Sequence, residues 1–153
     1  MTRMRLTLHT DYALRTLLYL GARPEVRVSI REIAHAYGIS ENHLVKVVHR
    51  LGQGEFIKTI RGRGGGLMLA RPAEEIRIGT VVRFTEEDMM LVDCDGLSSG
   101  GRPCILSPAC RLRGVLGEAL DAFMSVLDRY TLADILQPTD LARLFPELAK
   151  PSA

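Results

Sequence analysis

The chain has 153 residues, a net charge of only +2 and an ordinary apolar content of 46%. This length predicts one domain, at most with an extended appendage, that can bury a core without disulfides. No apolar run is long enough to span a membrane, and no secretory signal opens the chain. An odd number of cysteines, three, argues against a disulfide scaffold. We therefore expect a cytoplasmic protein without a membrane segment.

Positive charge is concentrated in the first half of the chain. Residues 1–71 contain 12 lysines and arginines against 5 acidic residues, a net charge of +7, whereas residues 72–153 carry a net charge of −5. Such a basic half favours a polyanionic partner, most simply nucleic acid. Chance scatter of surface charges is the alternative explanation of the same asymmetry.

Apolar spacing and capping residues predict the first two helices. Residues 10–20 place leucines on one helical face, with Thr10 as the N-cap and Asp11 in the first turn, where a carboxylate complements the helix dipole. Ser29 and Glu32 have the spacing of a capping box and open a short second helix.

A third helix follows the second after a tight turn. Gly38 supplies the left-handed turn, Ser40 caps the new helix, and Gly52 ends it after Leu51. Two short helices joined by a glycine turn predict a helix-turn-helix, whose second helix reads DNA. That second helix carries polar and basic side chains on its outer side, namely Asn42, His43, Lys46, His49 and Arg50.

Two short β-rich runs separated by a glycine-rich turn predict a hairpin directly after the helix-turn-helix, which is the wing of a winged helix. The turn, residues 61–66, presents Arg61 and Arg63 on a frame of glycines. Arginines in this setting suit a narrow minor groove. A phosphate-binding nucleotide loop is the rival interpretation, but the turn lacks the required Gly-Lys-Ser/Thr ending.

The second half contains one long amphipathic helix. We expect a fourth helix over residues 78–86, the long helix over 112–130, a short helix over 131–136, and a tail after Pro138 that is mobile at its end. The apolar stripe of the long helix is too broad for a small winged-helix core to cover. A matching helix of a second subunit would cover it, which predicts a homodimer.

All three cysteines lie in one irregular segment between the fourth and the long helix. Nine residues separate Cys94 from Cys104 and five separate Cys104 from Cys110, with Gly, Ser and Pro filling the gaps. Structural zinc favours four close ligands, often in paired Cys-x-x-Cys turns, which this segment lacks. An iron–sulfur cluster tolerates wider spacing and needs one ligand from elsewhere. Buried structural cysteines and a Cys104–Cys110 thiol switch remain alternatives.

No catalytic constellation accompanies these motifs, so we do not expect an enzyme. All four histidines lie in the basic half. His43 and His49 are expected to contact DNA rather than metal, and His35 is expected on a helix surface.

The motifs together resemble the NsrR family of nitric-oxide-sensing repressors, within a winged-helix group that also includes the iron–sulfur regulator IscR. The resemblance extends over nearly the whole chain. It rests on four segments, namely residues 4–15, the recognition helix at 39–51, the glycine wing at 61–66, and Tyr130-Thr-Leu-Ala-Asp134.

The resemblance implies a homodimer that binds a palindromic operator on double-stranded DNA and releases it when nitric oxide attacks a 4Fe–4S cluster. Cys94, Cys104 and Cys110 match the three cysteine ligands of that family, and Asp11 matches a fourth ligand contributed by the other subunit. IscR-like proteins use a histidine where this chain has Arg113, so their ligand set does not carry over. The gap between Cys94 and Cys104 is longer than is usual for NsrR.

We therefore expect a mainly α fold with a small β-hairpin wing, in which a winged helix-turn-helix is joined to a long dimerisation helix. The expected function is DNA-binding repression controlled by an iron–sulfur cluster, 4Fe–4S rather than 2Fe–2S, that senses nitric oxide. Alternatives are an iron–sulfur or thiol-based redox regulator of the same fold, and an electron-transfer iron–sulfur protein. The expected organisation is a winged helix-turn-helix (1–75), a connecting helix with the cluster-binding loop (76–110), a dimerisation helix with a short final helix (111–137), and a C-terminal tail (138–153).

Overall fold

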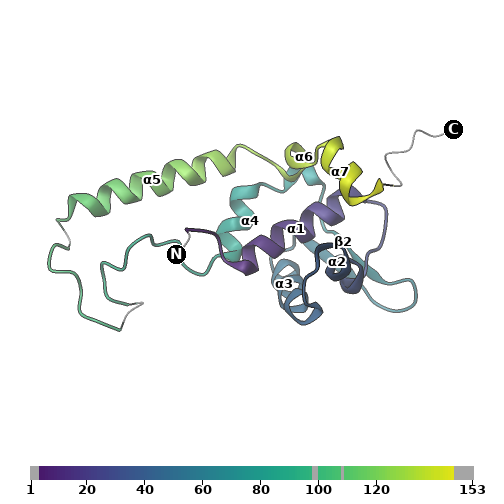
Figure 1. Ribbon diagram of the computed structural model, residues 1–153, viewed down its shortest axis with the longest axis horizontal. Coiled ribbons are helices and arrows are strands. Elements are labelled where there is room, and N and C mark those ends of the chain that lie inside the picture. The colour runs from purple at the N-terminus through teal and green to yellow at the C-terminus, as the bar shows by residue number, and fades with distance from the viewer. Residues whose placement is uncertain (1–3, 98–99, 108, 147–153) are drawn as a thin grey trace.

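The computed structural model describes residues 4–97, 100–107 and 109–146, and it is mainly helical with one two-stranded antiparallel sheet (Figure 1). This is the winged-helix architecture with a long additional helix that the sequence predicts. The elements in chain order are α1 (Leu8–Ala22), α2 (Ile30–Tyr37), α3 (Glu41–Gln53), β1 (Ile57–Ile60), β2 (Gly66–Leu69), η1 (Ala73–Glu75), α4 (Ile78–Thr85), α5 (Arg111–Asp128), α6 (Leu132–Ile135) and α7 (Pro138–Leu144).

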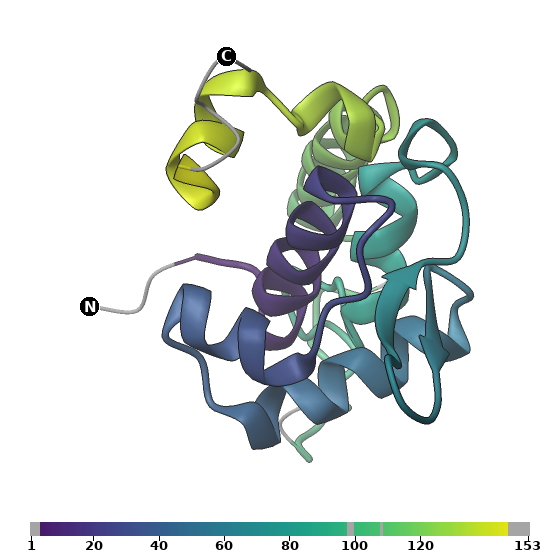
Figure 2. The same cartoon turned by 90° about the vertical axis from the view of Figure 1, so that its right-hand side faces the viewer.

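The core lies where α1 packs against α3 and α4, with α2 and the hairpin closing its sides (Figure 2). Its apolar residues recur at helical spacing on each element, so each helix contributes one buried stripe. None of the described helices has both the length and the apolar content needed to cross a membrane. The fully buried side chains of this core include Leu17, Leu20, Ile33, Leu44, Val47, Leu51, Val81 and Val82.

The first helix begins earlier than predicted. Its N-cap is Thr7, whose hydroxyl accepts a hydrogen bond from the Thr10 amide at 3.3 Å, and the helix starts at Leu8. The prediction that Thr10 caps the helix is wrong, because the Thr10 side chain is fully buried and bonds the Thr85 hydroxyl at 2.8 Å. A threonine that could cap locally is used instead for contact with α4.

The predicted start and end of α2 are confirmed. The Ser29 hydroxyl accepts a hydrogen bond from the Glu32 amide at 3.1 Å, and Gly38 ends the helix in the left-handed region at φ 65°. The Glu32 carboxylate accepts hydrogen bonds from the Tyr19 hydroxyl at 3.0 Å and from Arg23 at 2.8 Å. Its side chain therefore ties α2 to α1.

Close backbone approach explains two glycines of the wing. Leu67 and Val28 exchange two backbone hydrogen bonds of 2.7 and 3.1 Å, so the segment before α2 adds a bridge to the hairpin. A Cβ on Gly66 would lie 3.0 Å from the Val28 carbonyl oxygen, and one on Gly65 would collide with the Ile60 carbonyl oxygen. The glycines thus serve the fold of the wing, as the winged-helix interpretation requires.

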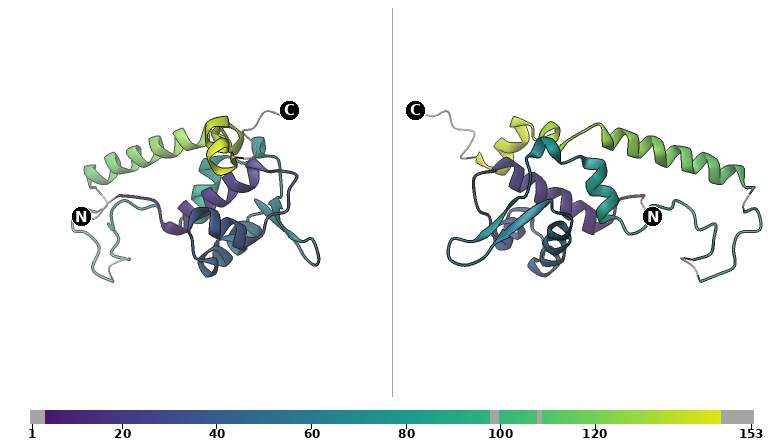
Figure 3. Two further views of the ribbon diagram at one scale, coloured as in Figure 1. Left: turned by 45° about the vertical axis from the view of Figure 1, so that its right-hand side comes forward. Right: turned by 180° about the vertical axis from the view of Figure 1, so that it is seen from behind.

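The long helix α5 is attached to the body at its C-terminal end. Arg83 of α4 makes two hydrogen bonds of 2.6 and 2.7 Å to the Asp128 carboxylate, and the bond from Arg83 holds the pKa of Asp128 below its usual value. Arg77 also donates to the Asp128 carbonyl at 2.8 Å. The other end of α5 extends away from the winged helix, with the cysteine loop beside it (Figures 1 and 3).

The segment after residue 137, expected to be a tail, forms a helix and then packs on the body. Phe145, which follows α7, is only 2% exposed. Its ring lies edge-on to Tyr19 with centroids 4.8 Å apart, and the Arg23 guanidinium carbon lies 5.1 Å from its centroid. The expected mobile end falls on residues 147–153, outside the described residues.

Replacing Phe145 with alanine should lower the free energy of unfolding by about 3 kcal/mol, the lower end of the range for truncating a buried aromatic ring. The loss should appear in chemical denaturation of the whole protein. Val26→Ala, at an exposed position before α2, is the apolar control and should cost much less. A Phe145→Ala protein as stable as the parent would show that the C-terminal segment does not dock in solution.

Candidate nucleic-acid interface and cysteine loop

The recognition helix α3 presents one exposed polar face. Asn42, Lys46 and His49 are exposed and follow one another at intervals of four and three residues, which places them on the same side of a helix. Ser40, the N-cap residue, is also exposed, and its side chain makes no capping hydrogen bond. Val45, which the sequence analysis did not single out, is half exposed within this face. An exposed valine amid polar residues is the signal that could have found it.

Two other residues of α3 predicted to contact DNA are bound within the chain. His43 is half-buried and lies edge-on to Tyr12 of α1 with ring centroids 4.8 Å apart. The Arg50 guanidinium donates a hydrogen bond to the Phe84 carbonyl at 2.9 Å, and its carbon lies 4.0 Å from the centre of the Phe84 ring. These two side chains therefore face α1 and α4.

The wing presents its two arginines at an exposed tip. Arg61 and Arg63 are both exposed, and the alternating glycines Gly62 and Gly64 adopt φ values of 92° and 66° that favour glycine. Arg27, before α2, donates a hydrogen bond to the Gly64 carbonyl at 2.8 Å. Arg27 is a further cation at the wing that no motif revealed, because its partner lies 37 residues away.

Helix α3 and the wing lie on the same side of the molecule, opposite to α5, α6 and α7 (Figures 1 and 2). His9 of α1 is a further titratable group near α3. Burial lowers the pKa of His9, and the charges of His43 and Arg50 lower it further. The His9 imidazole is therefore favoured in its neutral form beside α3.

The cysteine loop is closed by backbone hydrogen bonds. The Cys104 amide donates to the Cys94 carbonyl at 2.9 Å, and the Gly101 amide donates to the Gly96 carbonyl at 3.1 Å. Gly96 has a φ of 70°, and a Cβ on it would lie 2.8 Å from the Gly101 carbonyl oxygen. The long gap between the first two cysteines thus folds back on itself and brings their backbones together.

The third cysteine lies at the junction of the loop with α5. Cys110 is the N-cap residue of α5. Arg113, one turn further on, lies 3.7 Å from the Asp95 carboxylate and donates to the Ser107 hydroxyl at 3.3 Å. The side chain at the position of the IscR-type histidine therefore fastens the loop to α5.

All three cysteines are free thiols, Cys104 is exposed, and Cys94 and Cys110 are half-buried. Three free thiols on one loop are a suitable donor set for an iron–sulfur cluster, which is bound by thiolates. Within the described residues, no three histidine, cysteine, aspartate or glutamate side chains are gathered into one metal-binding group. The loop would therefore have to close further to hold such a group.

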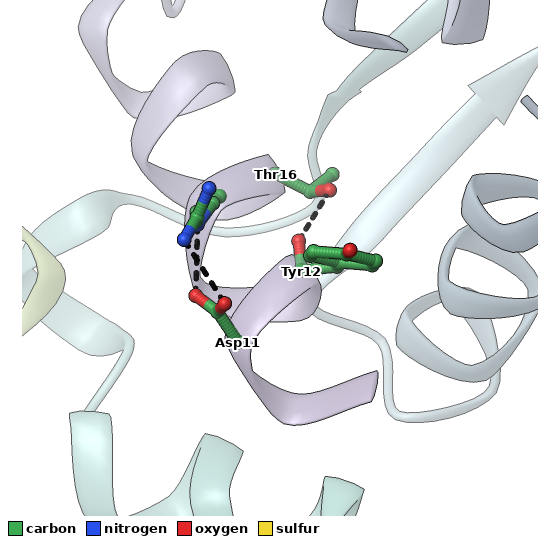
Figure 4. A network of polar contacts seen from close by, with 4 residues as sticks. Asp11, Tyr12 and Thr16 are labelled. Atoms are coloured by element: carbon green, nitrogen blue, oxygen red, sulfur yellow. Dashed lines mark hydrogen bonds and ion pairs between the residues drawn. The ribbon is translucent and has the colours of Figure 1, made fainter. Parts of the chain in front are cut away.

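Asp11, predicted as the fourth ligand, lies in the first turn of α1 and is engaged by Arg15. Arg15 Nε and Nη2 donate to the two carboxylate oxygens at 2.8 and 3.0 Å (Figure 4). The Asp11 side chain remains 38% exposed. In Figure 1 the cysteine loop lies at the free end of α5, away from α1.

Known proteins similar to this chain are transcriptional regulators. Residues 6–138 match the Rrf2 family, described as an iron-dependent transcriptional regulator. The chain is 54% identical over 135 residues to the HTH-type transcriptional regulator NsrR of Geobacillus kaustophilus strain HTA426, covering 88% of this chain and 90% of that protein. It is 50% identical over 135 residues to the NsrR of Bacillus subtilis strain 168, covering 88% and 91%.

Solved structures agree on the fold. The IscR of T. potens superposes with a TM-score of 0.71 at 22% identity, covering 98% of this chain and 94% of that one. The match to the family model spans the winged helix, the cysteine loop and α5, so it includes every element described above except most of α7. The chain is therefore a winged-helix transcriptional regulator, not an enzyme, and belongs to the Rrf2 family.

Proposed function

We propose that the protein is a repressor whose operator binding is controlled by an iron–sulfur cluster on the cysteine loop. The observation that carries the proposal is the presence, in one chain, of a winged helix with exposed cations and a loop with three free thiols. The names of the similar regulators from Geobacillus and Bacillus support repression of the NsrR type. The proposed signal is nitric oxide, acting in the cytoplasm.

The proposed DNA contacts divide between two grooves. Ser40, Asn42 and Lys46 lie in the first half of α3, from which a recognition helix reaches base edges in the major groove. His49 extends the same face toward the backbone phosphates. Arg61 and Arg63 at the wing tip suit the minor groove, where narrow A·T-rich segments attract arginine.

The proposed cluster ligands are Cys94, Cys104 and Cys110, with Asp11 of the partner subunit as the fourth. When bound, a 4Fe–4S cluster supplies iron sites with which nitric oxide reacts. The chain's part is to bring the three thiolates together, and the backbone bond between Cys104 and Cys94 supports that role. Arg15 has to give up or share the Asp11 carboxylate before it can bind iron.

The proposed homodimer explains the uncovered side of α5. Leu112, Val115, Phe123 and Val126 are exposed large apolar residues on this helix. An equivalent helix from a second copy would bury them, as symmetric dimers commonly do, and two recognition helices would then face a palindromic operator. The same pairing would bring α1 of one subunit toward the loop of the other.

The first test of this function concerns DNA. Lys46→Ala should weaken binding to the operator by about 1–3 kcal/mol and relax the preference at one base pair, as loss of a good base contact does. Arg61→Ala should weaken binding most for operators with A·T-rich flanks. Titrations at fixed salt against operator variants measure both effects, and a Lys46→Ala, Arg61→Ala double variant that binds like the parent would contradict the interface.

The second test concerns the cysteines. Changing any one cysteine to alanine should abolish or strongly reduce bound iron and sulfide in protein purified without oxygen, while the variants stay dimeric by light scattering because α5 supplies the interface. Arg102→Ala, an exposed residue within the same loop, is the control and should keep its iron. Three cysteine variants with full iron content would refute the ligand assignment, and a parent with no iron but a disulfide would favour a thiol regulator.

The third test concerns Asp11. Asp11→Ala should still assemble a cluster on three cysteines, but its reaction with nitric oxide and the coupling of that reaction to DNA release should change, because carboxylate is the harder and weaker iron ligand. Arg15→Ala, which frees the carboxylate, should retain the parent's cluster spectrum. An iron-ligand spectrum identical in the parent and Asp11→Ala would exclude Asp11 as a ligand.

A further inference from the structure

The end of α4 is bonded to two different helices by three successive residues. Phe84 contacts Arg50 of α3, as described above. Thr85 shares a hydrogen bond of 2.8 Å with the buried Thr10 of α1. Glu86 accepts hydrogen bonds from the Thr7 amide at 2.8 Å and from the Thr7 hydroxyl at 3.0 Å. Residues 87–93 then connect Glu86 to the first cysteine, so this junction lies between the cysteine loop on one side and α1 and the recognition helix on the other.

The contact between Arg50 and Phe84 has two components that favour a fixed position. The last carbonyl groups of a helix have no partner within the helix and carry its negative dipole end, and the Arg50 guanidinium donates to one of them. The same guanidinium lies over the face of the Phe84 ring, the geometry of a cation–π contact. The Arg50 side chain is therefore held against the C-terminal end of α4 and does not extend freely from α3.

The Phe84 ring is itself held in place. It lies edge-on to the buried Phe56 with centroids 5.5 Å apart. A Cβ on Gly54, which follows α3, would lie 2.7 Å from the Phe84 ring and 2.6 Å from the Phe56 ring. The end of α3 thus sits directly against this aromatic pair, and a shift of α4's last turn would have to move the end of α3 with it.

Arg50 lies at the edge of the exposed polar face. At about 3.6 residues per turn it lies about 40° from Lys46, between Lys46 and His43, whose ring lies against α1. Arg50 is exposed, so burial does not separate it from DNA. The hydrogen bond to the Phe84 carbonyl and the contact with the Phe84 ring direct its guanidinium toward α4.

We propose that Arg50 is a positioning residue that locks the recognition helix to the last turn of α4, and that it makes no contact of its own with DNA. Through this lock, a change in the cysteine loop that moves the end of α4 alters the placement of α3. The inference rests on the proposed function, because it concerns how the cysteine loop controls operator binding. It assigns the coupling to one side chain, which energetic measurements on variants can test.

The test compares operator binding by the cluster-loaded and cluster-free forms, using a duplex selected from random DNA by the parent protein. Arg50→Ala should reduce the ratio of the two affinities at least threefold toward one, and Phe84→Leu should do the same. Arg50→Lys should not restore the ratio, because lysine keeps the charge but lacks the planar group.

Two control variants accompany this test. Lys46→Ala should lower both affinities by the same factor, and Arg129→Ala, a charge-matched control on the far side, should change neither.

Two further readouts do not depend on the cluster. The dependence of log affinity on log salt should keep the parent's slope in Arg50→Ala, whereas loss of one phosphate contact would reduce it by about 0.9. In the cluster-free protein, amide hydrogen exchange at the C-terminal end of α3 should rise at least fivefold in Arg50→Ala and in Phe84→Leu.

An unchanged affinity ratio in Arg50→Ala would overturn the proposed lock, and a reduced salt slope that Arg50→Lys restores would make Arg50 a DNA contact instead. If the parent itself bound DNA equally with and without its cluster, the proposed function would fail instead. The salt slope and the hydrogen exchange would then still decide the role of Arg50.

Discussion

The structure depends on the last turn of α4, where the winged helix meets the part of the chain that carries the cysteine loop and α5. Phe84, Thr85 and Glu86 are bonded to α3, to the buried side of α1 and to the N-cap of α1. The Thr10–Thr85 hydrogen bond lies inside the core, where an unpaired hydroxyl would be costly, so α1 and α4 have little freedom to separate. Any movement of the loop that follows Glu86 therefore acts on two helices of the winged helix together.

At the free end of α5, far from the winged helix, the chain is largely exposed to solvent. The cysteine loop and the outer part of α5 have few neighbours in one subunit, with Ile105 96% exposed and Leu97 78% exposed. Large apolar side chains in water favour association. Exposed loop residues, an uncovered helix and three free thiols are the observations that support the proposed dimer and the proposed cluster.

Local signals in the sequence predicted the helices and strands well, but they did not predict which distant residues some side chains would contact. The helix start at Ser29, the turn at Gly38 and the glycine wing depend on neighbouring residues and are confirmed. The predicted capping box is confirmed only in its Ser29 half, because the Glu32 carboxylate accepts from Tyr19 and Arg23. Thr10 was misassigned because its hydrogen-bond partner lies 75 residues away. Arg50 presents the same difficulty, since helical spacing indicates which side a residue occupies but not that Phe84 will cover it. The helix before Phe145 was missed although Pro138 at its first position is a local signal of a helix start. The docking of Phe145 against Tyr19 and Arg23 has no local signal, because these partners lie more than 100 positions earlier in the chain.

We propose that one cluster on the cysteine loop controls operator binding. The most direct measurement is an anaerobic titration of the cluster-loaded protein on operator DNA with nitric oxide, following visible absorption and bound DNA in the same sample. DNA should be released in parallel with loss of the cluster's absorption band. DNA that stays bound after the band has gone, or that is released while the band is intact, would contradict it.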